Sequence, residues 1–140
     1  MFATTDSTLG IKGLALSLCL TCLACANTAT SGRNSLGWLD GRWRGVALEV
    51  ERDKTWSIKL EANVRRQRYE IEYPSENCSG TWQLVDSDAC KARFAETITN
   101  DRHNNCVNGT IIVTRLDQRT ISYTWFRDEK AVASAFLTKD

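Results

Sequence analysis

The residues of this chain that could carry chemistry are few and scattered. His103 is the only histidine, and it stands in a polar segment rich in asparagine. A Ser-His-Asp or Cys-His site would depend on it alone, because both need an imidazole base. A zinc site built from histidine and cysteine would be short of ligands for the same reason. We therefore expect a protein that is not an enzyme and that holds no metal and no cofactor.

Carboxylates offer the remaining catalytic chemistry. Glu70 and Glu72 share one face of a predicted strand, and Glu96 interrupts an apolar alternation. A pair of carboxyl groups can hydrolyse a glycosidic bond when one donates a proton and the other attacks or activates water. A buried carboxylate without a partner is costly. We therefore interpret Glu96 as a structural residue that pairs with Arg93 or Arg115.

Three cysteines follow residue 26, and they allow three single pairings. We favour Cys78 with Cys106, since both stand beside turn residues at strand ends, where two chain segments can approach at disulfide distance. Cys90 opens a strand-like run, where it could be buried or could make an intermolecular bond. A catalytic thiol is the less favoured alternative, because only His103 could activate it.

Tryptophan is frequent for so short a chain, with five copies. Aromatic side chains at the mouth of a barrel could stack on a sugar or another flat ligand. Most of these tryptophans fall on the apolar side of a predicted strand, where core filling is the simpler interpretation. The candidate binding residues are Trp56, Tyr69, Trp82, Arg102 and His103.

Residues 1–26 have the pattern of an export signal. The apolar run from Leu14 to Ala26 ends in Ala-Cys-Ala and is shorter than the roughly 20 residues of a membrane-spanning helix. Cleavage after Ala26 would release a soluble protein. Lipidation of Cys25 would instead attach it to a membrane, with residues 27–39 as a flexible tether. Both alternatives predict an extracytoplasmic location, periplasmic or membrane-anchored, where thiols oxidise.

The charge pattern excludes a broad electrostatic target. The formal net charge is only +1, so no overall field steers the protein toward nucleic acid or an anionic membrane. Arg65, Arg66 and Arg68 form one local basic cluster between two strand-like runs. We interpret it as a solvated hairpin turn, because nucleic-acid recognition would need a wider basic face.

From residue 42 onward, apolar and polar residues alternate with the period of a β-strand, and turn residues recur about every ten positions. The alternation predicts strands at 42–50, 55–62, 67–73, 81–85, 92–99, 110–116, 119–127 and 131–138. Without a helix to cover a sheet face, an all-β antiparallel meander over residues 40–140 should close into a small barrel. A two-sheet sandwich is the alternative. Asn108-Gly109 is the strongest hairpin signal and predicts a type I′ turn.

The segment Gly41-Arg42-Trp43-Arg44-Gly45 resembles the Gly-x-Trp signature that opens calycin-type barrels such as lipocalins and avidins. The resemblance implies that Trp43 plugs one end of a calycin-like barrel, with Gly41 and Gly45 letting the backbone curve over it. It also implies an arginine that stacks on this tryptophan, for which Arg127 is the candidate.

A wider resemblance extends from Trp43 to Leu137 and rests on five segments, namely Trp43-Arg44-Gly45, Tyr73 to Gly80, Ala92 to Ile98, Cys106 to Gly109 and Ile121 to Trp125. Their order is similar to that of a small bacterial extracytoplasmic β-domain, which occurs alone behind signal peptides or appended to actinobacterial serine/threonine kinases. The resemblance implies a binding or sensing role and supports the bond between Cys78 and Cys106.

These observations favour a non-enzymatic extracytoplasmic binding module that contacts a protein partner through residues 75–79 and 100–105. An inhibitor of a peptidase or a lysozyme is one concrete version, by analogy of fold. A small-ligand carrier of lipocalin type is the alternative, and it predicts a cavity lined by Trp56, Tyr69 and Trp82. A carboxylate-dependent hydrolase is less favoured and predicts two carboxyl groups converging in a cleft.

Overall fold

The computed structural model describes residues 36–140, so the predicted export signal, Cys25 and most of the predicted tether lie outside the described residues. Eight strands follow one another along the chain. They are β1 (Gly41–Glu49), β2 (Lys54–Asn63), β3 (Arg68–Tyr73), β4 (Cys78–Ser87), β5 (Lys91–Asp101), β6 (Thr110–Arg115), β7 (Thr120–Arg127) and β8 (Lys130–Lys139). Each predicted strand is present, and several extend further than the alternation indicated.

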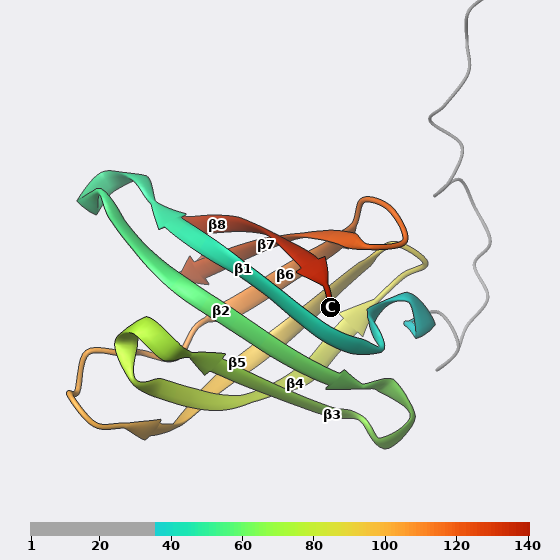
Figure 1. Cartoon of the computed structure of the whole chain (residues 1–140), viewed down its shortest axis with the longest axis horizontal. Helices are drawn as coiled ribbons and strands as arrows, with labels where there is room; N and C mark the ends of the chain where they lie inside the picture. Colours follow the sequence, from blue (N-terminus) through green and yellow to red (C-terminus); the bar gives the residue numbers. More distant parts are fainter. Residues whose placement is uncertain (1–35) are drawn as a thin grey trace, which may run out of the picture.

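The strands form one closed antiparallel barrel in sequence order (Figure 1). Each strand pairs with the next, and β1 pairs with β8, with Trp43 opposite Lys139 and Leu48 opposite Ser134. The prediction of a closed all-β meander is therefore confirmed, and the two-sheet sandwich is wrong. Closure leaves no exposed sheet edge, which is what a small sheet without covering helices requires.

Side chains alternate between the interior of the barrel and its outer surface. On β5, for example, Ala92, Phe94 and Glu96 are buried while the residues between them are exposed. The fully buried large side chains that fill the interior are Leu39, Trp43, Ile58, Leu60, Ile71, Phe94, Ile111, Val113, Ile121, Tyr123 and Leu137. The barrel is therefore packed by its own side chains, as barrels of this strand number can be.

Trp43 closes one end of the barrel. Its side chain is 1% exposed, and its indole Nε1 donates a hydrogen bond to the backbone oxygen of Leu39 at 2.8 Å. Leu36 and Leu39 are also buried in the core. The folded domain therefore includes residues 36–39, which the sequence had assigned to the tether.

The two glycines of the Gly-x-Trp segment occupy positions where a side chain does not fit. Gly41 has a φ of 123°, which L-residues rarely adopt. A Cβ at Gly45 would lie 2.4 Å from the backbone oxygen of Phe136 on β8. Both residues therefore allow β1 to run against β8 at the closed end.

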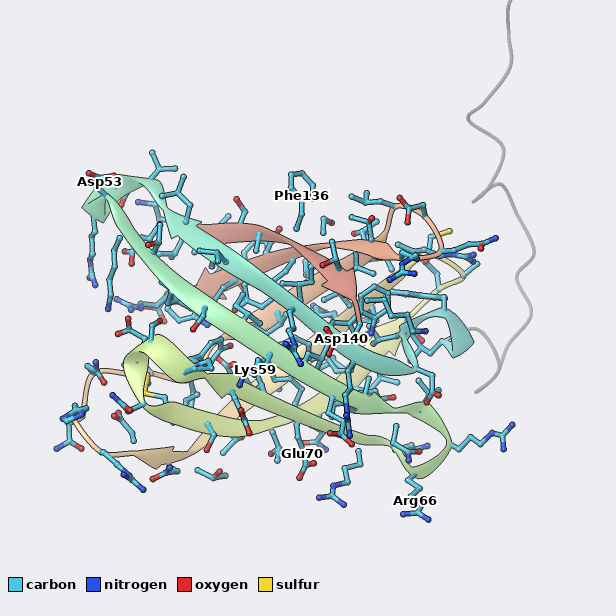
Figure 2. All side chains as sticks on the ribbon, in the orientation of Figure 1. Asp53, Lys59, Arg66, Glu70, Phe136 and Asp140 are labelled. Atoms are coloured by element: carbon cyan, nitrogen blue, oxygen red, sulfur yellow. A yellow bond between two sulfur atoms is a disulfide. The ribbon has the colours of Figure 1, made fainter. Side chains whose placement is uncertain are left out.

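The opposite end, which we call the mouth, is formed by the β1–β2, β3–β4, β5–β6 and β7–β8 connections. Figure 2 shows the separation, with Asp53 of the β1–β2 connection at one end and Arg66 of the β2–β3 connection at the other. Two mouth connections contain a 3-10 turn followed by a residue in the left-handed region, Asp53 after Val50–Arg52 and Asn77 after Pro74–Glu76. These tight turns hold the mouth loops close to the strand ends.

The type I′ turn predicted at Asn108-Gly109 is wrong. β5 ends at Asp101 and β6 begins at Thr110, so an eight-residue connection, 102–109, lies between them. The Asn108 side chain instead accepts a hydrogen bond from the Ile98 amide at 2.8 Å, and the Gly109 carbonyl accepts one from the Glu96 amide at 2.9 Å. Both residues thus extend the contact between the connection and β5.

The two-residue hairpin lies at Asp128-Glu129, between Arg127 and Lys130, which are paired across β7 and β8. Both turn residues have positive φ, 48° and 64°. Neither residue type favours this region as glycine does, so we expect the change Glu129→Gly with Asp128→Asn to raise the free energy of unfolding by about 1 kcal/mol. Urea unfolding measures the change, with Glu129→Ala as the control. Equal or lower stability of the Asn-Gly variant would contradict the assigned turn.

Candidate functional site

A cavity of about 70 Å³ opens at the mouth of the barrel. Four aromatic side chains contribute to its wall, Trp56, Tyr73, Tyr123 and Trp125. The charged residues that line it are Glu49, Arg52, Lys54, Glu76, Glu96 and Arg127. The remaining lining residues are Ile98, Asn105, Cys106 and Val107. The cavity therefore combines an aromatic wall with charges of both signs in a space well below the roughly 300 Å³ of common small-molecule sites.

Charged residues reach this cavity because they continue the inward-facing positions of the strands. Glu49 follows Trp43, Gly45 and Ala47 on β1, and it is 5% exposed. Arg127 follows Tyr123 and Trp125 on β7 in the same way. A charged residue at a core-facing position of a predicted strand indicates a site at the end of the barrel. The alternation of the sequence shows Glu49 and Arg127 at such positions.

Glu96 lies at the floor of the cavity and is only 4% exposed. Its Oε1 accepts hydrogen bonds from the Tyr73 hydroxyl, at short distance, and from the Trp82 indole Nε1 at 3.1 Å. Its Oε2 accepts one from the Trp125 indole Nε1 at 3.1 Å. The Tyr73 hydroxyl also lies 3.2 Å from the Tyr123 hydroxyl. Neutral donors therefore surround this carboxylate.

The expected pairing of Glu96 with Arg93 or Arg115 is wrong. Arg93 points outward and pairs with Asp86. Among the ion pairs of residues 36–140, none contains Glu96 or Arg115. Because Glu96 faces inward and Arg93 lies an odd number of positions away on the same strand, the two side chains extend to opposite faces of the sheet.

Burial dominates the ionisation of the polar groups at the cavity floor. It raises the pKa of Glu96 above the usual glutamate range, although the hydrogen bonds from Tyr73, Trp82 and Trp125 act in the opposite direction. Burial also raises the pKa of Tyr73 and of Tyr123 well above the ordinary tyrosine value. Both tyrosines therefore keep their hydroxyl protons at neutral pH and remain hydrogen-bond donors.

The cations at the rim differ in their pairing. Arg52 Nε lies 3.1 Å from a carboxylate oxygen of Glu49, and Lys54 Nζ lies 2.8 Å from one of Glu76. Arg127 belongs to none of the ion pairs within residues 36–140. Its guanidinium carbon lies 5.0 Å from the centre of the Trp125 ring, and its buried Nε has no hydrogen-bond partner among the described residues.

A disulfide joins two of the mouth segments, the start of β4 and the β5–β6 connection. It links Cys78 to Cys106, with the Cα atoms 6.5 Å apart, so the predicted pairing is confirmed. By loop-closure entropy, a bridge spanning 28 residues stabilises the fold by roughly 3–4 kcal/mol. Cys90 lies elsewhere, buried at the turn before β5.

Asp101 organises the loop that contains this disulfide. Its carboxylate accepts backbone hydrogen bonds from His103 at 3.2 Å, Asn105 at 3.3 Å and Cys106 at 3.0 Å. These bonds, that from Cys106 most strongly, lower the pKa of Asp101. The Asn105 side chain in turn donates to a carboxylate oxygen of Glu76 at 3.2 Å. The β3–β4 and β5–β6 connections are therefore tied covalently and by hydrogen bonds.

Potential metal ligands also gather here, since donor atoms of Cys78, Asp101 and Cys106 lie within 4.8 Å of one another. The two sulfur atoms are joined in the disulfide. A disulfide sulfur is not the thiolate that binds zinc or other soft metals. This group is therefore best explained as the disulfide and the aspartate that orders its loop.

The predicted site residues separate into three places. Trp56 lines the mouth cavity and packs edge-on against Trp125 at 6.4 Å between ring centres. Tyr69 and Trp82 are core residues that pack on Phe94, at 4.9 and 5.4 Å. Arg102 and His103 are exposed in the β5–β6 connection, and neither is among the lining residues of the cavity.

The expected role of Arg127 in the plug is wrong. The cation over the Trp43 ring is Lys139, whose Nζ lies 5.3 Å from the ring centre. Arg127 lies over Trp125 at the mouth, the other end of the barrel. The reason is topological, because Arg127 ends β7 beside the start of β8, whereas Trp43 pairs with Lys139 at the end of β8.

No protein-family model, no curated protein and no solved structure matches this chain. The resemblance to the bacterial extracytoplasmic β-domain therefore stays a prediction from the sequence. Within residues 36–140, no helix is both long and apolar enough to cross a membrane.

Gly109 is the glycine on which the floor of the site depends. A Cβ there would lie 2.2 Å from Trp125 Nε1, the atom that donates to Glu96. We expect Gly109→Ala to displace the indole and to lower the free energy of unfolding by about 1–3 kcal/mol through overpacking. Gly37→Ala is the control, because no atom lies within 4 Å of a Cβ at that position. Equal stability of the two variants, with an unshifted Trp125 indole NMR signal, would contradict this assignment.

The raised pKa of Glu96 predicts a pH-dependent contribution to stability. The folded state holds the proton more tightly than the unfolded state, so this contribution is complete below the ordinary glutamate pKa of about 4.3. It is lost as the pH rises through the higher pKa of the folded state. We therefore expect the free energy of unfolding of the wild type, relative to Glu96→Gln, to fall between the unfolded-state pKa of about 4.3 and the higher pKa of folded Glu96, and to level off above the latter.

Urea unfolding from pH 4 upward measures this difference, with the outward-facing Glu72→Gln as the control for replacing a glutamate. A difference between wild type and Glu96→Gln that stayed constant or rose with pH would refute the assigned direction.

Proposed function

We propose that this protein is a non-enzymatic extracytoplasmic binding module whose mouth loops contact a protein partner, as an inhibitor or a sensor does. The observation that carries this proposal is the tie between the β3–β4 and β5–β6 connections, made by the Cys78–Cys106 disulfide and by Asn105 on Glu76. Loops fixed before binding lose little conformational entropy when a partner docks. Their exposed residues, including Arg102 and His103, are available for contact.

The extracytoplasmic location is supported by the same bond. Disulfides form and persist in oxidising compartments and are rare in the cytosol. The disulfide thus agrees with the export signal expected in residues 1–26, which lie outside the described part of the chain. A direct mass measurement of the mature N-terminus distinguishes a soluble protein from one attached through a lipidated Cys25.

The packing of the barrel disfavours the small-ligand carrier. Two of the three residues expected to line a carrier cavity, Tyr69 and Trp82, pack on Phe94 in the core. The mouth cavity of about 70 Å³ lies far below the roughly 300–1,000 Å³ of sites for drug-sized ligands. The mouth cavity is therefore too small for a lipid or a sugar ring.

One observation supports the carboxylate hydrolase as a second candidate, because Glu49 and Glu96 line the same cavity. Glu49 is engaged by Arg52, however, and Glu96 already accepts three hydrogen bonds. The binding module accounts better for both carboxylates, since neither has a clear path to a glycosidic oxygen in so small a space.

Partner capture with matched variants tests the proposal. The exported protein is immobilised and exposed to envelope extract and to secretions of host and competitor cells, and a stoichiometric partner is identified by mass spectrometry. We expect Arg102→Ala with His103→Ala to weaken this partner's binding by at least about tenfold, as loss of contact side chains does. Arg65→Ala with Arg66→Ala is the control, since these exposed residues lie in the β2–β3 connection at the closed end, where Figure 2 labels Arg66.

A third variant tests the competing surface. Phe136 projects from the outside of β8 (Figure 2) and is 69% exposed, with Val46 60% exposed on the neighbouring β1. Loss of the partner with Phe136→Ser, and not with the Arg102 and His103 variant, would overturn the assignment of binding to the mouth.

A further inference from the structure

Glu96 has an unusual combination of burial, charge and position. The carboxylate is 4% exposed, it lines the mouth cavity, and no cation within residues 36–140 forms an ion pair with it. Its three hydrogen-bond partners, Tyr73, Trp82 and Trp125, are all neutral. A buried carboxylate is normally paired with a cation or kept protonated, because its charge is expensive to desolvate.

The hydrogen bonds of Glu96 are also incomplete. An ionised carboxylate offers about four acceptor positions, two on each oxygen. Oε1 uses both of its positions, for Tyr73 and Trp82, whereas Oε2 receives only Trp125 among the described residues. One acceptor position on Oε2 is therefore open to a further donor.

The aromatic wall around this carboxylate is suited to a cation. Trp56 and Trp125 meet edge to face, with an interplanar angle of 87°, and Tyr73 and Tyr123 add two further rings to the lining. Aromatic faces attract cations, and enclosed aromatic sites bind alkylammonium groups for this reason. An ionised Glu96 beneath these rings adds a Coulomb attraction for a cation.

None of the three cations that line the cavity forms an ion pair with Glu96 within residues 36–140. Arg52 and Lys54 are held by Glu49 and Glu76, at 3.1 and 2.8 Å. Arg127 lies over Trp125 and is the one positive charge of the lining that has no ion-pair partner within residues 36–140. It covers one face of Trp125, and its positive charge weakens the binding of a second cation nearby.

We propose that the mouth cavity binds a primary ammonium group, with Glu96 as its counter-ion and the aromatic wall around its last methylene groups. A volume of about 70 Å³ accommodates an ammonium and the end of an alkyl chain. The group is supplied by a lysine side chain of the protein partner or by a small free amine. The first source rests on the proposed function, whereas the cavity's preference for ammonium does not.

The test titrates the purified exported protein with n-butylammonium chloride, which copies the lysine side chain. The indole Nε1–H signals of Trp82 and Trp125 report directly on Glu96 in two-dimensional NMR spectra. We expect saturable shifts of these signals with butylammonium, and none with n-butanol or sodium butyrate at the same concentrations. Absence of saturation with butylammonium, or equal shifts with butanol or butyrate, would overturn the proposal.

Two variants give opposite expectations. Glu96→Gln should weaken butylammonium binding by at least about tenfold, because the counter-ion is lost. Arg127→Gln should tighten it, because a like charge is removed. If the ligand were instead an anion held by Arg127, Arg127→Gln would abolish binding, and that result would overturn the proposal. Should Glu96→Gln fail to fold, the wild-type ligand series together with Arg127→Gln decides the sign of the bound charge.

A final arm separates the two sources of the ammonium. Nα-acetyl-L-lysine N-methylamide binding at least as tightly as butylammonium supports a partner's lysine, whereas binding of butylammonium alone supports a small free amine. Partner capture that depends on Arg102 and His103, without any butylammonium binding, would overturn the ammonium site and leave the proposed function intact. Butylammonium binding without capture of a protein partner would support the ammonium site and overturn the proposed function.

Discussion

The hydrogen-bonded pairing of β1 with β8 turns an eight-stranded meander into a closed barrel, and it depends on the close approach of the two strands at Gly45. Closure places one face of every strand in a confined interior that buried side chains fill, apart from the small cavity at the mouth. The interior then has no room for a large ligand. What remains for contact with other molecules is the outer surface and the mouth, where the inward-facing positions carry charge.

Glu96 is an ionisable group that is buried in the packed interior and joined by hydrogen bonds to several strands. Its donors come from three other strands, Tyr73 from β3, Trp82 from β4 and Trp125 from β7. A substitution at this position would therefore be felt around half the barrel. These bonds offset part of the cost of burying the carboxylate, while the open acceptor position leaves it able to accept one more hydrogen bond.

At the mouth, the cavity that contains Glu96 is also lined by the β3–β4 and β5–β6 connections. Cys106 is part of the disulfide and also lines the cavity, and Asn105 bonds to Glu76, the partner of Lys54. The two tied connections therefore form part of the cavity wall. A partner that docks on the loops would cover the cavity, and a side chain from its surface would be the natural group to enter.

The sequence by itself determined the strands, the closed all-β fold, the burial of Trp43 and the preferred disulfide. The strands and the preferred disulfide follow from residue alternation and from turn residues beside Cys78 and Cys106, which are local properties of the chain, whereas the burial of Trp43 was implied by the Gly-x-Trp resemblance. The inward register of Glu49, Glu96 and Arg127 was also present in the alternation, so the location of charge at a barrel end could have been inferred from it.

Only the tertiary structure decided the partners of those residues. Tyr73 lies 23 residues before Glu96 and Trp125 lies 29 residues after it, and their meeting depends on how the strands are staggered around the barrel. The same stagger placed Lys139 on Trp43, where Arg127 was expected, and Arg127 on Trp125. Alternation fixes which face a side chain takes, but contact across a closed barrel is set by register and strand tilt, which no local pattern encodes.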